Sequence, residues 1–354
     1  MKQTFENVDC AVCGTGTSTV PVAGSRTDIY FKKFGLPLSR SKWTFCSQCT
    51  LLYQNPRPSL EAMHRFYQSG LYFGTRSADI QRLKRVALRK HREKLSEAFC
   101  GLSLLPSGLA VDIGCGIGGA VARMKELGLK PVGVEPDPVV AKMGREQFGL
   151  DIRAGLFGRG LLEKESVSFF YSNHVFEHLQ EPNEVVAAMA EALKPGGRVF
   201  VCVPTFWGGT SWEAYAWQNL SHNYLFTHET LSQLFFKHGL VTLRWKYVGA
   251  SNELWLLAEK PGELKSYPVP IDKPDLGSVL RYYRYAVPLR AVAFFPWRFA
   301  FLLKEVFVAA REDGLGGLKQ DLISIFRTPL ADTYRACRSL FLARSLPAPA
   351  KENP

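Results

Sequence analysis

Four glycines follow a short apolar stretch in the middle of the chain, with carboxylates on either side of them. The run "LAVDIGCGIGG" covers residues 109–119, and it holds Asp112 ahead of the glycines, while Glu135 follows about twenty residues later. A glycine-rich turn between a strand and a helix lets the backbone approach a ligand closely. A carboxylate at the end of the next strand accepts hydrogen bonds from ribose hydroxyls. We therefore expect a nucleotide-like ligand at this turn.

Two ligands contain such a ribose, namely a dinucleotide and S-adenosylmethionine (SAM). The spacing of Gly114, Gly116 and Gly119 also satisfies the dinucleotide fingerprint. Asp112 stands where it would repel a pyrophosphate, whereas SAM carries an ammonium and a sulfonium group that a carboxylate attracts. We therefore favour SAM, bound by a loop that contains Asp112, Gly114, Cys115 and Gly116.

Two CxxC pairs stand near the start of the chain. Cys10 and Cys13 form the first pair, and Cys46 and Cys49 form the second. Two residues between ligands let a tight turn aim both sulfurs at one point, and Zn²⁺ prefers four such ligands in a tetrahedron. Four thiolates leave no open position for water, so this zinc is expected to be structural. A redox site is the alternative, but it is typical of a single CxxC at a helix start.

Histidines are the candidates for proton transfer. Methyl transfer from SAM is an in-line displacement that needs positioning and, for a hydroxyl or a carbon acid, a general base. His222, in "LSHNYLFT", is expected between the fifth sheet strand and the next helix, where it would cap the pocket as base or substrate ligand. A structural histidine is the alternative. His174 and His178, with Glu177 between them, superficially suggest a metal pair but lack a third ligand nearby.

Alternating strands and helices must hold these residues in place. Short apolar strands are expected at residues 109–113, 131–135, 151–155, 167–172, 198–204, 240–249 and 252–260. The last two are joined by a tight turn into which no helix fits, so they must be antiparallel. Strands alternating with helices elsewhere predict a doubly wound parallel sheet.

Four motifs occur in the order typical of class I SAM-dependent methyltransferases, which this chain therefore resembles. They are "VDIGCGIGG", "GVEPD", "NHVFEHL" and "LKPGGRVFVCVP". The flanking runs "CSQCTLLYQNPRPSLEAMHRFYQ" and "HNYLFTHETLSQLFFKHG" resemble bacterial members with an N-terminal zinc-binding module, which include sugar and polysaccharide-pathway enzymes. The resemblance implies an α/β fold with a seven-stranded Rossmann-like sheet and an N-terminal zinc module, and the pattern of the remaining residues predicts a helical C-terminal extension.

The resemblance also implies roles for single residues. The methionine end of SAM would be surrounded by Asp112, Gly114 and Gly116. Glu135 would bind the ribose hydroxyls, and Asn173, just past the fourth strand of the sheet, would line the pocket near the methyl group.

Three further features refine the resemblance. His222 matches a histidine that some sugar methyltransferases use as base. The third sheet strand ends in "AGLF" (154–157), without the acidic residue that many relatives place beside the adenine. Sugar C-methyltransferases carry a second Rossmann-like domain, which residues 265–354 do not resemble, so O-methylation is favoured.

Composition shifts predict four segments. They are a zinc-binding module at 1–58, a helical connector or lid at 59–105, a SAM-binding methyltransferase domain at 106–262 and a basic, aromatic helical extension at 263–354.

The net charge of +12 bears on the partners. Basic residues gather in 81–95 and in the tail, where they either attract an anionic acceptor, such as a nucleotide sugar or lipid-linked saccharide, or form a solvated face. The aromatic, basic tail predicts peripheral membrane contact. A zinc-containing RNA methyltransferase is the alternative function, although "CTLLYQNPRP" offers no basic fingertip and nucleic acid is not the expected partner.

The start of the chain has no secretory pattern, and no apolar run approaches the ~20 residues of a membrane-spanning helix. We therefore expect a cytoplasmic enzyme of polysaccharide biosynthesis, in contact with the inner face of the membrane.

Overall fold

The structure is a computed structural model, and it describes most of the chain. The described residues are 5–16, 19–24, 42–68, 80–100, 107–207, 221–248, 251–262 and 275–281. The predicted extension 263–354 lies outside them apart from 275–281.

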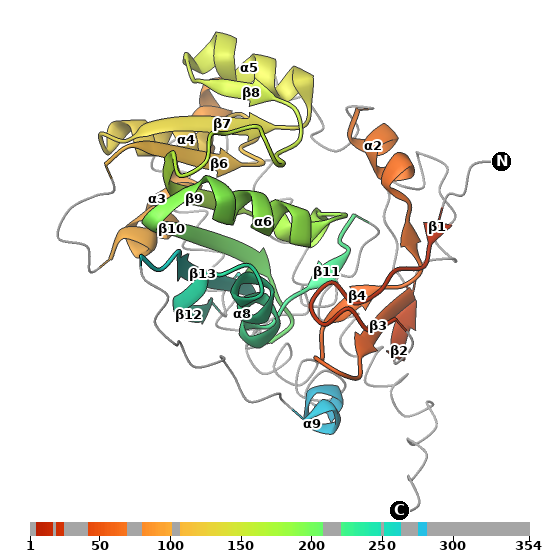
Figure 1. The fold of residues 1–354 in the computed structure, drawn as a ribbon. Coiled ribbons are helices and arrows are strands. Elements are labelled where there is room, and N and C mark those ends of the chain that lie inside the picture. The colour runs from red at the N-terminus through yellow and green to blue at the C-terminus, as the bar shows by residue number, and fades with distance from the viewer. Residues whose placement is uncertain are drawn as a thin grey trace, which may run out of the picture. The chain divides into compact units, whose positions relative to one another are not determined.

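A seven-stranded sheet forms the centre of the fold (Figure 1). Its strand order is β12-β13-β10-β9-β6-β7-β8. The strands are β6 (Leu109–Ile113), β7 (Lys130–Glu135), β8 (Ile152–Ala154), β9 (Val167–Asn173), β10 (Leu193–Pro204), β12 (Val241–Val248) and β13 (Glu253–Glu259). All seven expected strands are confirmed, and β10 is longer than expected because it already begins at Leu193. The expected Rossmann-like α/β fold is thereby confirmed.

The register of the sheet brings the carboxyl ends of five strands to one edge. β10, β9, β6, β7 and β8 pair in parallel, each with the next. Ile113 at the end of β6 pairs with Val134 on one side and with Ser172 on the other. β12 and β13 are neighbours joined by only four residues, so they run antiparallel, because a parallel pair needs a longer crossover.

Helices cover the sheet and begin close to its carboxyl edge. They are α3 (Ile80–Phe99), α4 (Gly119–Glu126), α5 (Pro138–Phe148), α6 (Pro182–Ala192) and α8 (His228–Phe236). α3 packs against α4, and Figure 1 shows α6 lying across β9 and β10. Asp137 begins α5 by accepting the N–H groups of Val139 and Val140, and Gly149 ends this helix in a left-handed conformation.

A second, smaller sheet combines N-terminal strands with a strand from later in the chain. Its order is β11-β4-β3-β2, with β2 (Thr19–Gly24), β3 (Lys42–Cys46), β4 (Leu52–Gln54) and β11 (Tyr224–Leu225). β1 (Phe5–Glu6) pairs with β5 (Arg57–Pro58), and α2 (Leu60–Gln68) follows directly. The N-terminal strands therefore share one sheet with the segment that follows His222.

The chain forms two compact units. The first comprises residues 1–204, 218–246 and 254–273, and it contains both sites discussed below. The second comprises 205–217, 247–253 and 274–354, of which α9 (Leu276–Arg281) is the described helix. The four segments expected from composition stay a prediction. Within the described part, every helix is too short or too polar to cross a membrane.

We expect a methyl group at Gly144 to destabilise the fold. A Cβ there would meet the carbonyl oxygen of Ile117 at 3.0 Å and the side chain of Ile152, so α5 would have to move away from the sheet. Gly144→Ala should lower the free energy of unfolding by about 1–3 kcal/mol in urea titrations. Gly158→Ala is the control, since its Cβ would meet nothing within 4 Å. Equal stability of the two variants would contradict this packing.

Candidate active site

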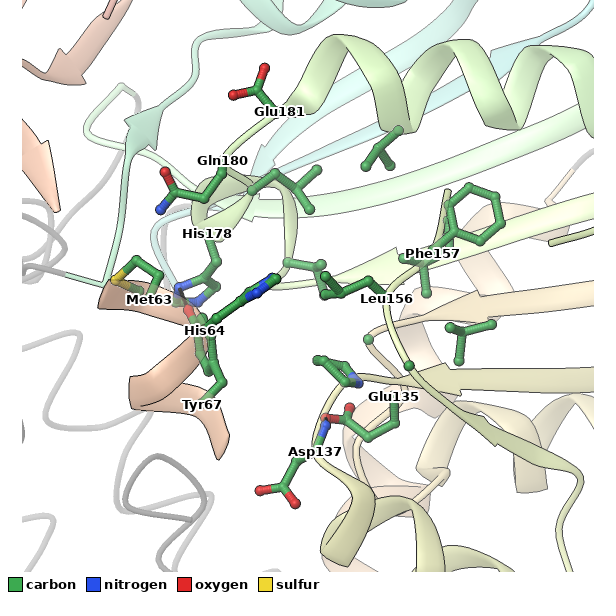
Figure 2. Close-up of a pocket in the computed structure, with 18 of the residues that line it drawn as sticks. Met63, His64, Tyr67, Glu135, Asp137, Leu156, Phe157, His178, Gln180 and Glu181 are labelled. Atoms are coloured by element: carbon green, nitrogen blue, oxygen red, sulfur yellow. Dashed lines mark hydrogen bonds between the residues drawn. The ribbon is translucent and has the colours of Figure 1, made fainter. Parts of the chain in front are cut away.

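A cavity of about 340 Å³ lies at the carboxyl edge of the sheet (Figure 2). The ends of β6 and β7, the loops after β7, β8 and β9, helix α2 and the start of α6 line it. Its apolar wall includes Leu60, Met63, Leu156, Phe157, Leu179 and Val185. Open α/β sheets bind ligands at this edge, so the cavity lies where the fold places a ligand site.

The glycine loop borders the cavity and needs its glycines. Gly114, Gly116 and Gly118 all have positive φ, at 68°, 55° and 88°, which side chains other than glycine rarely adopt. Gly114 lines the cavity, and a Cβ on it would overlap the side chain of Val175. The loop therefore lets backbone rather than side chains face this end of the cavity.

Glu135 is the buried carboxylate of the cavity. Its Oε2 accepts the N–H of Gly116 at 2.8 Å, and its Oε1 accepts the N–H of Asp137 at 2.9 Å. Burial raises the pKa of Glu135 to about 7, while these two hydrogen bonds act in the opposite direction. Two backbone amides thus fix the carboxylate, which still has lone pairs to offer to a ligand.

Asp137 also lines the cavity, although we had not named it from the sequence. Its Oδ1 caps α5, whereas its Oδ2 is buried and accepts no hydrogen bond among the described residues. A buried acceptor without a donor is costly, and a ligand hydroxyl or cation would satisfy it. The Asp at the start of α5, in "VEPDP", was the signal that could have identified it.

Four other predicted cofactor residues are not among the residues that line the cavity, namely Asp112, Cys115, Gly116 and Asn173. Burial and the charge of Glu135 raise the pKa of Asp112 well above its usual range. Cys115 packs in the core with Val121 and Ile152. Asn173 accepts a hydrogen bond from the buried Lys94 at 2.6 Å. Their roles in binding SAM stay predictions.

The loop after β8 supplies an apolar side to the cavity. Gly155, Leu156 and Phe157 line it in the place where many relatives carry an acidic residue. Leu156 is 59% exposed, so it forms part of the rim, whereas Phe157 is buried against Phe170. A flat heterocycle would meet hydrophobic surface here rather than a hydrogen-bonding carboxylate.

A short 3-10 helix, Phe176–His178, carries a buried ionic cluster. The Glu177 carboxylate is fully buried, and its Oε1 lies 3.5 Å from His174 Nδ1 and 3.7 Å from His178 Nε2. Burial by itself would raise the pKa of Glu177, but the nearby imidazoles of His174, His178 and His222 lower it to about 2. The cluster therefore holds a permanent negative charge next to imidazoles.

His178 connects this cluster to the cavity. His178 lines the cavity, and its Nδ1 lies 2.7 Å from the carbonyl oxygen of Ser221 and 3.2 Å from the hydroxyl of Tyr67. A carbonyl oxygen only accepts, so we assign the Nδ1 proton to this bond, which leaves Nε2 towards Glu177.

His222, the base predicted from the sequence, lies next to His178. The two rings are in edge contact with centroids 4.6 Å apart. His222 is buried and is not among the residues that line the described cavity. Ligand atoms of Glu177, His178 and His222 lie within 4.8 Å of one another, whereas His174 belongs to a different group, with Cys202 and Glu253.

Helix α2 contributes residues that sequence reasoning missed. His64 lines the cavity, and its buried Nε2 has no hydrogen-bond partner among the described residues. Figure 2 shows Met63, His64 and Tyr67 on the same side of the cavity as His178, away from Glu135 and Asp137. The spacing of Leu60, Met63, His64 and Tyr67 on one helical face was the available signal.

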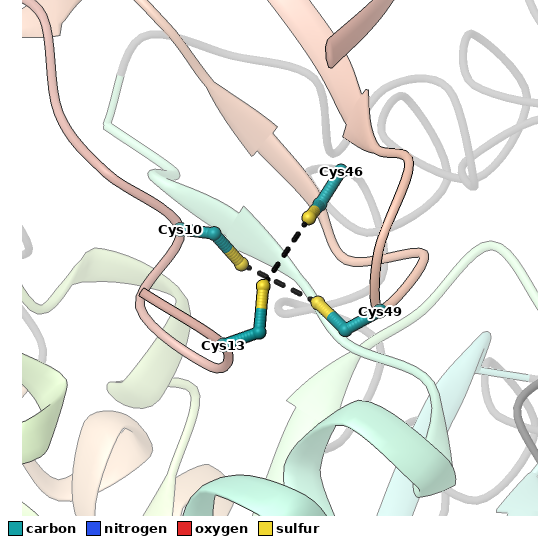
Figure 3. A group of neighbouring side chains, drawn as sticks. All are labelled: Cys10, Cys13, Cys46 and Cys49. Atoms are coloured by element: carbon teal, nitrogen blue, oxygen red, sulfur yellow. Dashed lines mark hydrogen bonds between the residues drawn. The ribbon is translucent and has the colours of Figure 1, made fainter. Parts of the chain in front are cut away.

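The four predicted metal ligands come together at the N-terminal strands (Figure 3). Sulfurs of Cys10 and Cys49 lie 3.3 Å apart, those of Cys13 and Cys46 lie 3.5 Å apart, and all four lie within 4.8 Å of one another. A tetrahedral Zn²⁺ with Zn–S bonds of about 2.3 Å separates its sulfurs by about 3.8 Å, so the cluster has a fitting size.

The two cysteine turns have the same backbone form. In the first, the N–H of Gly14 binds the carbonyl of Cys10, and in the second the N–H of Thr50 binds that of Cys46. Gly14 and Thr50 both have positive φ, at 74° and 63°. A non-glycine residue in this conformation carries a steric cost, which the four-cysteine arrangement must offset.

Comparison with known proteins agrees with the topology. Residues 82–244 match a family model described as a methyltransferase domain. This part of the chain is a methyltransferase domain. The domain has the Rossmann-like α/β fold of class I SAM-dependent methyltransferases, with a mixed sheet of seven strands.

Individual relatives are distant. Sterol 4-C-methyltransferase of Caenorhabditis elegans is 27% identical over 124 residues, which are 32% of this chain and 37% of that protein. Ubiquinone biosynthesis O-methyltransferase of Bartonella tribocorum is 26% identical over 236 residues, which are 65% of this chain and 81% of that enzyme. A solved SAM-dependent methyltransferase from Archaeoglobus fulgidus has a TM-score of 0.41 at 14% identity, over 50% of this chain and 94% of that one.

The matches cover only part of the first relatives, which limits what can be inferred about the activity of this chain. The chain spans 37% of the length of the C. elegans protein and 38% of a methyltransferase of Mycobacterium leprae. The acceptor of this chain must therefore be argued from its own site.

We expect SAM binding to depend on the ionisation of Glu135. Its raised pKa of about 7 means that the carboxylate forms only as the pH rises through that value, so affinity for the cationic ligand should increase from pH 6 to pH 8 and then level off. Calorimetric titration with SAM across this range measures the effect.

Glu135→Gln tests the assignment. The variant should bind SAM at least about tenfold more weakly at pH 8, the equivalent of one charge-assisted hydrogen bond, and should lose the pH dependence. A variant that keeps the wild-type pH profile would show that another group titrates.

Proposed function

We propose that the whole chain is a SAM-dependent methyltransferase that methylates a hydroxyl group of a small-molecule or glycan acceptor. The observation that carries the proposal is the cavity of the methyltransferase domain, in which the glycine loop and Glu135 lie opposite His64, Tyr67 and His178. One end of the cavity offers acidic groups to a cation, and the other offers imidazoles to a hydroxyl.

The acidic end suits SAM. Glu135 is fixed by two backbone amides and is placed to accept the ribose hydroxyls, and Asp137 presents a buried oxygen without a donor. The apolar residues Leu156 and Phe157 would contact the adenine. When bound, SAM supplies an electrophilic methyl group on its sulfonium.

We propose that the imidazole end removes the proton of the acceptor. As the carbon–sulfur bond breaks and the carbon–oxygen bond forms, the hydroxyl proton passes to one imidazole, either to Nε2 of His178 or to His222. His178 lines the cavity, and His222 packs against it. The ionised Glu177 stabilises the positive charge that then develops on the imidazoles.

For the acceptor we propose a sugar, as the sequence resemblance implies. Gln180, Glu181 and Glu184 line the cavity and can hydrogen-bond to sugar hydroxyls. The described lining residues include no lysine or arginine, so a neutral sugar ring fits this cavity better than an anionic group. In a nucleotide- or lipid-linked sugar, the phosphates would therefore contact residues beyond this lining.

Turnover by the purified full-length chain tests the function. We expect methyl transfer from labelled SAM to one class among nucleotide sugars, lipid-linked glycans and simple phenols, with a labelled product that mass spectrometry identifies. No transfer to any hydroxyl acceptor, with RNA methylated instead, would overturn the proposal.

Single histidine variants test the proton acceptors on that acceptor. His178→Ala and His222→Ala should each lower kcat by about 10²–10⁴-fold while SAM binding persists, because proton transfer contributes on that scale. His228→Gln is the matched control, since this histidine begins α8 and stacks on Trp245. Unchanged turnover of His222→Ala would remove it as a base.

We also propose that Cys10, Cys13, Cys46 and Cys49 bind a structural Zn²⁺. Elemental analysis should find about one zinc per chain. Cys46→Ser should lose it and lower the melting temperature, whereas Cys100→Ser, an exposed cysteine outside the cluster, should keep it. A purified wild-type chain without metal would contradict the site. Membrane contact through the extension and a cytoplasmic location stay predictions.

A further inference from the structure

The four-cysteine module and the histidine end of the cavity share one hydrogen-bonded sheet. β11 pairs antiparallel with β4, so that Tyr224 lies opposite Tyr53 and Leu225 opposite Leu52. The Gln54 side chain donates to the carbonyl of His222, and its backbone N–H donates to the carbonyl of Asn223 at 2.9 Å. The module therefore determines where the segment around His222 runs.

Asn223 connects this segment by hydrogen bonds to the 3-10 helix that carries His178. The Asn223 N–H donates to the carbonyl of Glu177 at 2.6 Å. Its side-chain amide donates to the carbonyls of His178 and Leu179, each at 3.0 Å. Asn223 is fully buried, so water cannot replace these three bonds.

Arg57 makes a second connection from the module. Its guanidinium is buried and donates to the Gln180 carbonyl at 2.8 Å and to the Tyr224 hydroxyl at 2.9 Å. It also pairs with Glu6 at 3.0 Å and with Glu181 at 3.4 Å. One buried charge thus joins β1, β5 and β11 to two residues that line the cavity.

Asn183 makes a third connection, and it reaches the cysteine turn itself. Its side-chain amide donates at 2.8 Å to the carbonyl of Ala11, which stands between Cys10 and Cys13. Asn183 lies in the first turn of α6, next to the cavity residues Glu184 and Val185. A change in the form of this cysteine turn would therefore move the start of α6.

We propose that the metal-loaded module positions the acceptor wall, which we define as residues 177–185, through the positioning residues Gln54, Arg57, Asn183 and Asn223. Metal occupancy then controls acceptor binding and leaves SAM binding unchanged. The SAM end depends on separate bonds, from Gly116 and Asp137 to Glu135, within the loops after β6 and β7. The inference rests on the proposed function where it names the acceptor and SAM. The effect of the metal on the acceptor wall can be measured without turnover.

Hydrogen exchange of the full-length chain tests the proposal directly. Removing the metal with a chelator should speed amide exchange in 177–185 and 221–225 by at least about tenfold, while exchange in 113–116 and 133–137 stays the same. The affinity for S-adenosylhomocysteine should change less than about twofold. Equal acceleration in both regions, or none in 177–185, would overturn the proposal.

Asn183→Leu separates positioning from metal loss. This variant should retain its metal yet show the faster exchange in 177–185, and with a productive acceptor it should raise the KM for the acceptor more than it lowers kcat. The matched control is Arg159→Gln, which removes an exposed ion pair to Glu184 on the same helix without contacting the module. If Asn183→Leu showed the same amide exchange in 177–185 as Arg159→Gln, Asn183 would have no positioning role.

If no acceptor is ever methylated while the exchange pattern appears as expected, the proposed function fails and the positioning role stands. If methylation is observed but metal removal leaves exchange in the acceptor wall unchanged, the positioning role fails and the function stands.

Discussion

The Glu135 carboxylate joins the two loops that form the acidic end of the cavity. One oxygen receives an amide proton from the loop after β6, and the other receives one from the loop after β7. Because these strands are parallel and in register, both loops leave the sheet at the same edge. Burying a carboxylate is costly, which is why its pKa is raised, and a cationic ligand offsets that cost.

A second buried carboxylate, that of Glu177, lies near the opposite end of the cavity, and its pKa is shifted in the other direction. Glu177 stays ionised because imidazoles surround it, and its pKa is lowered rather than raised. The same chemical group therefore suits two purposes. Glu135 can bind a positively charged ligand, whereas Glu177 can stabilise positive charge on the neighbouring imidazoles. The distinction comes from the surroundings and not from the residue type.

The N-terminal module is part of this second end. Through β11, Arg57 and Asn183 its backbone and side chains contact the segments that carry His178, His222 and the start of α6. A metal bound by the four cysteines would add rigidity to this small sheet, and these hydrogen bonds would extend that rigidity to the cavity. This explains why the module and the domain share strands instead of being joined by a free linker.

Local patterns in the sequence were enough to predict the strands, the glycine loop, Glu135 and the four cysteines. Each depends on spacing within a few residues, either an apolar run before glycines or a pair of cysteines separated by two positions. The order of the motifs along the chain then identified the sheet.

Only the tertiary structure decided which histidines meet. His64, His178 and His222 come from three elements far apart in the chain, and no periodicity relates them. Likewise Asp112 and Asn173 have suitable positions at strand ends, but neither lines the cavity, and the Asn173 side chain accepts a hydrogen bond from Lys94 instead. Spacing determines which groups share an element, whereas contacts between elements depend on how the sheet, α2 and the N-terminal strands pack together.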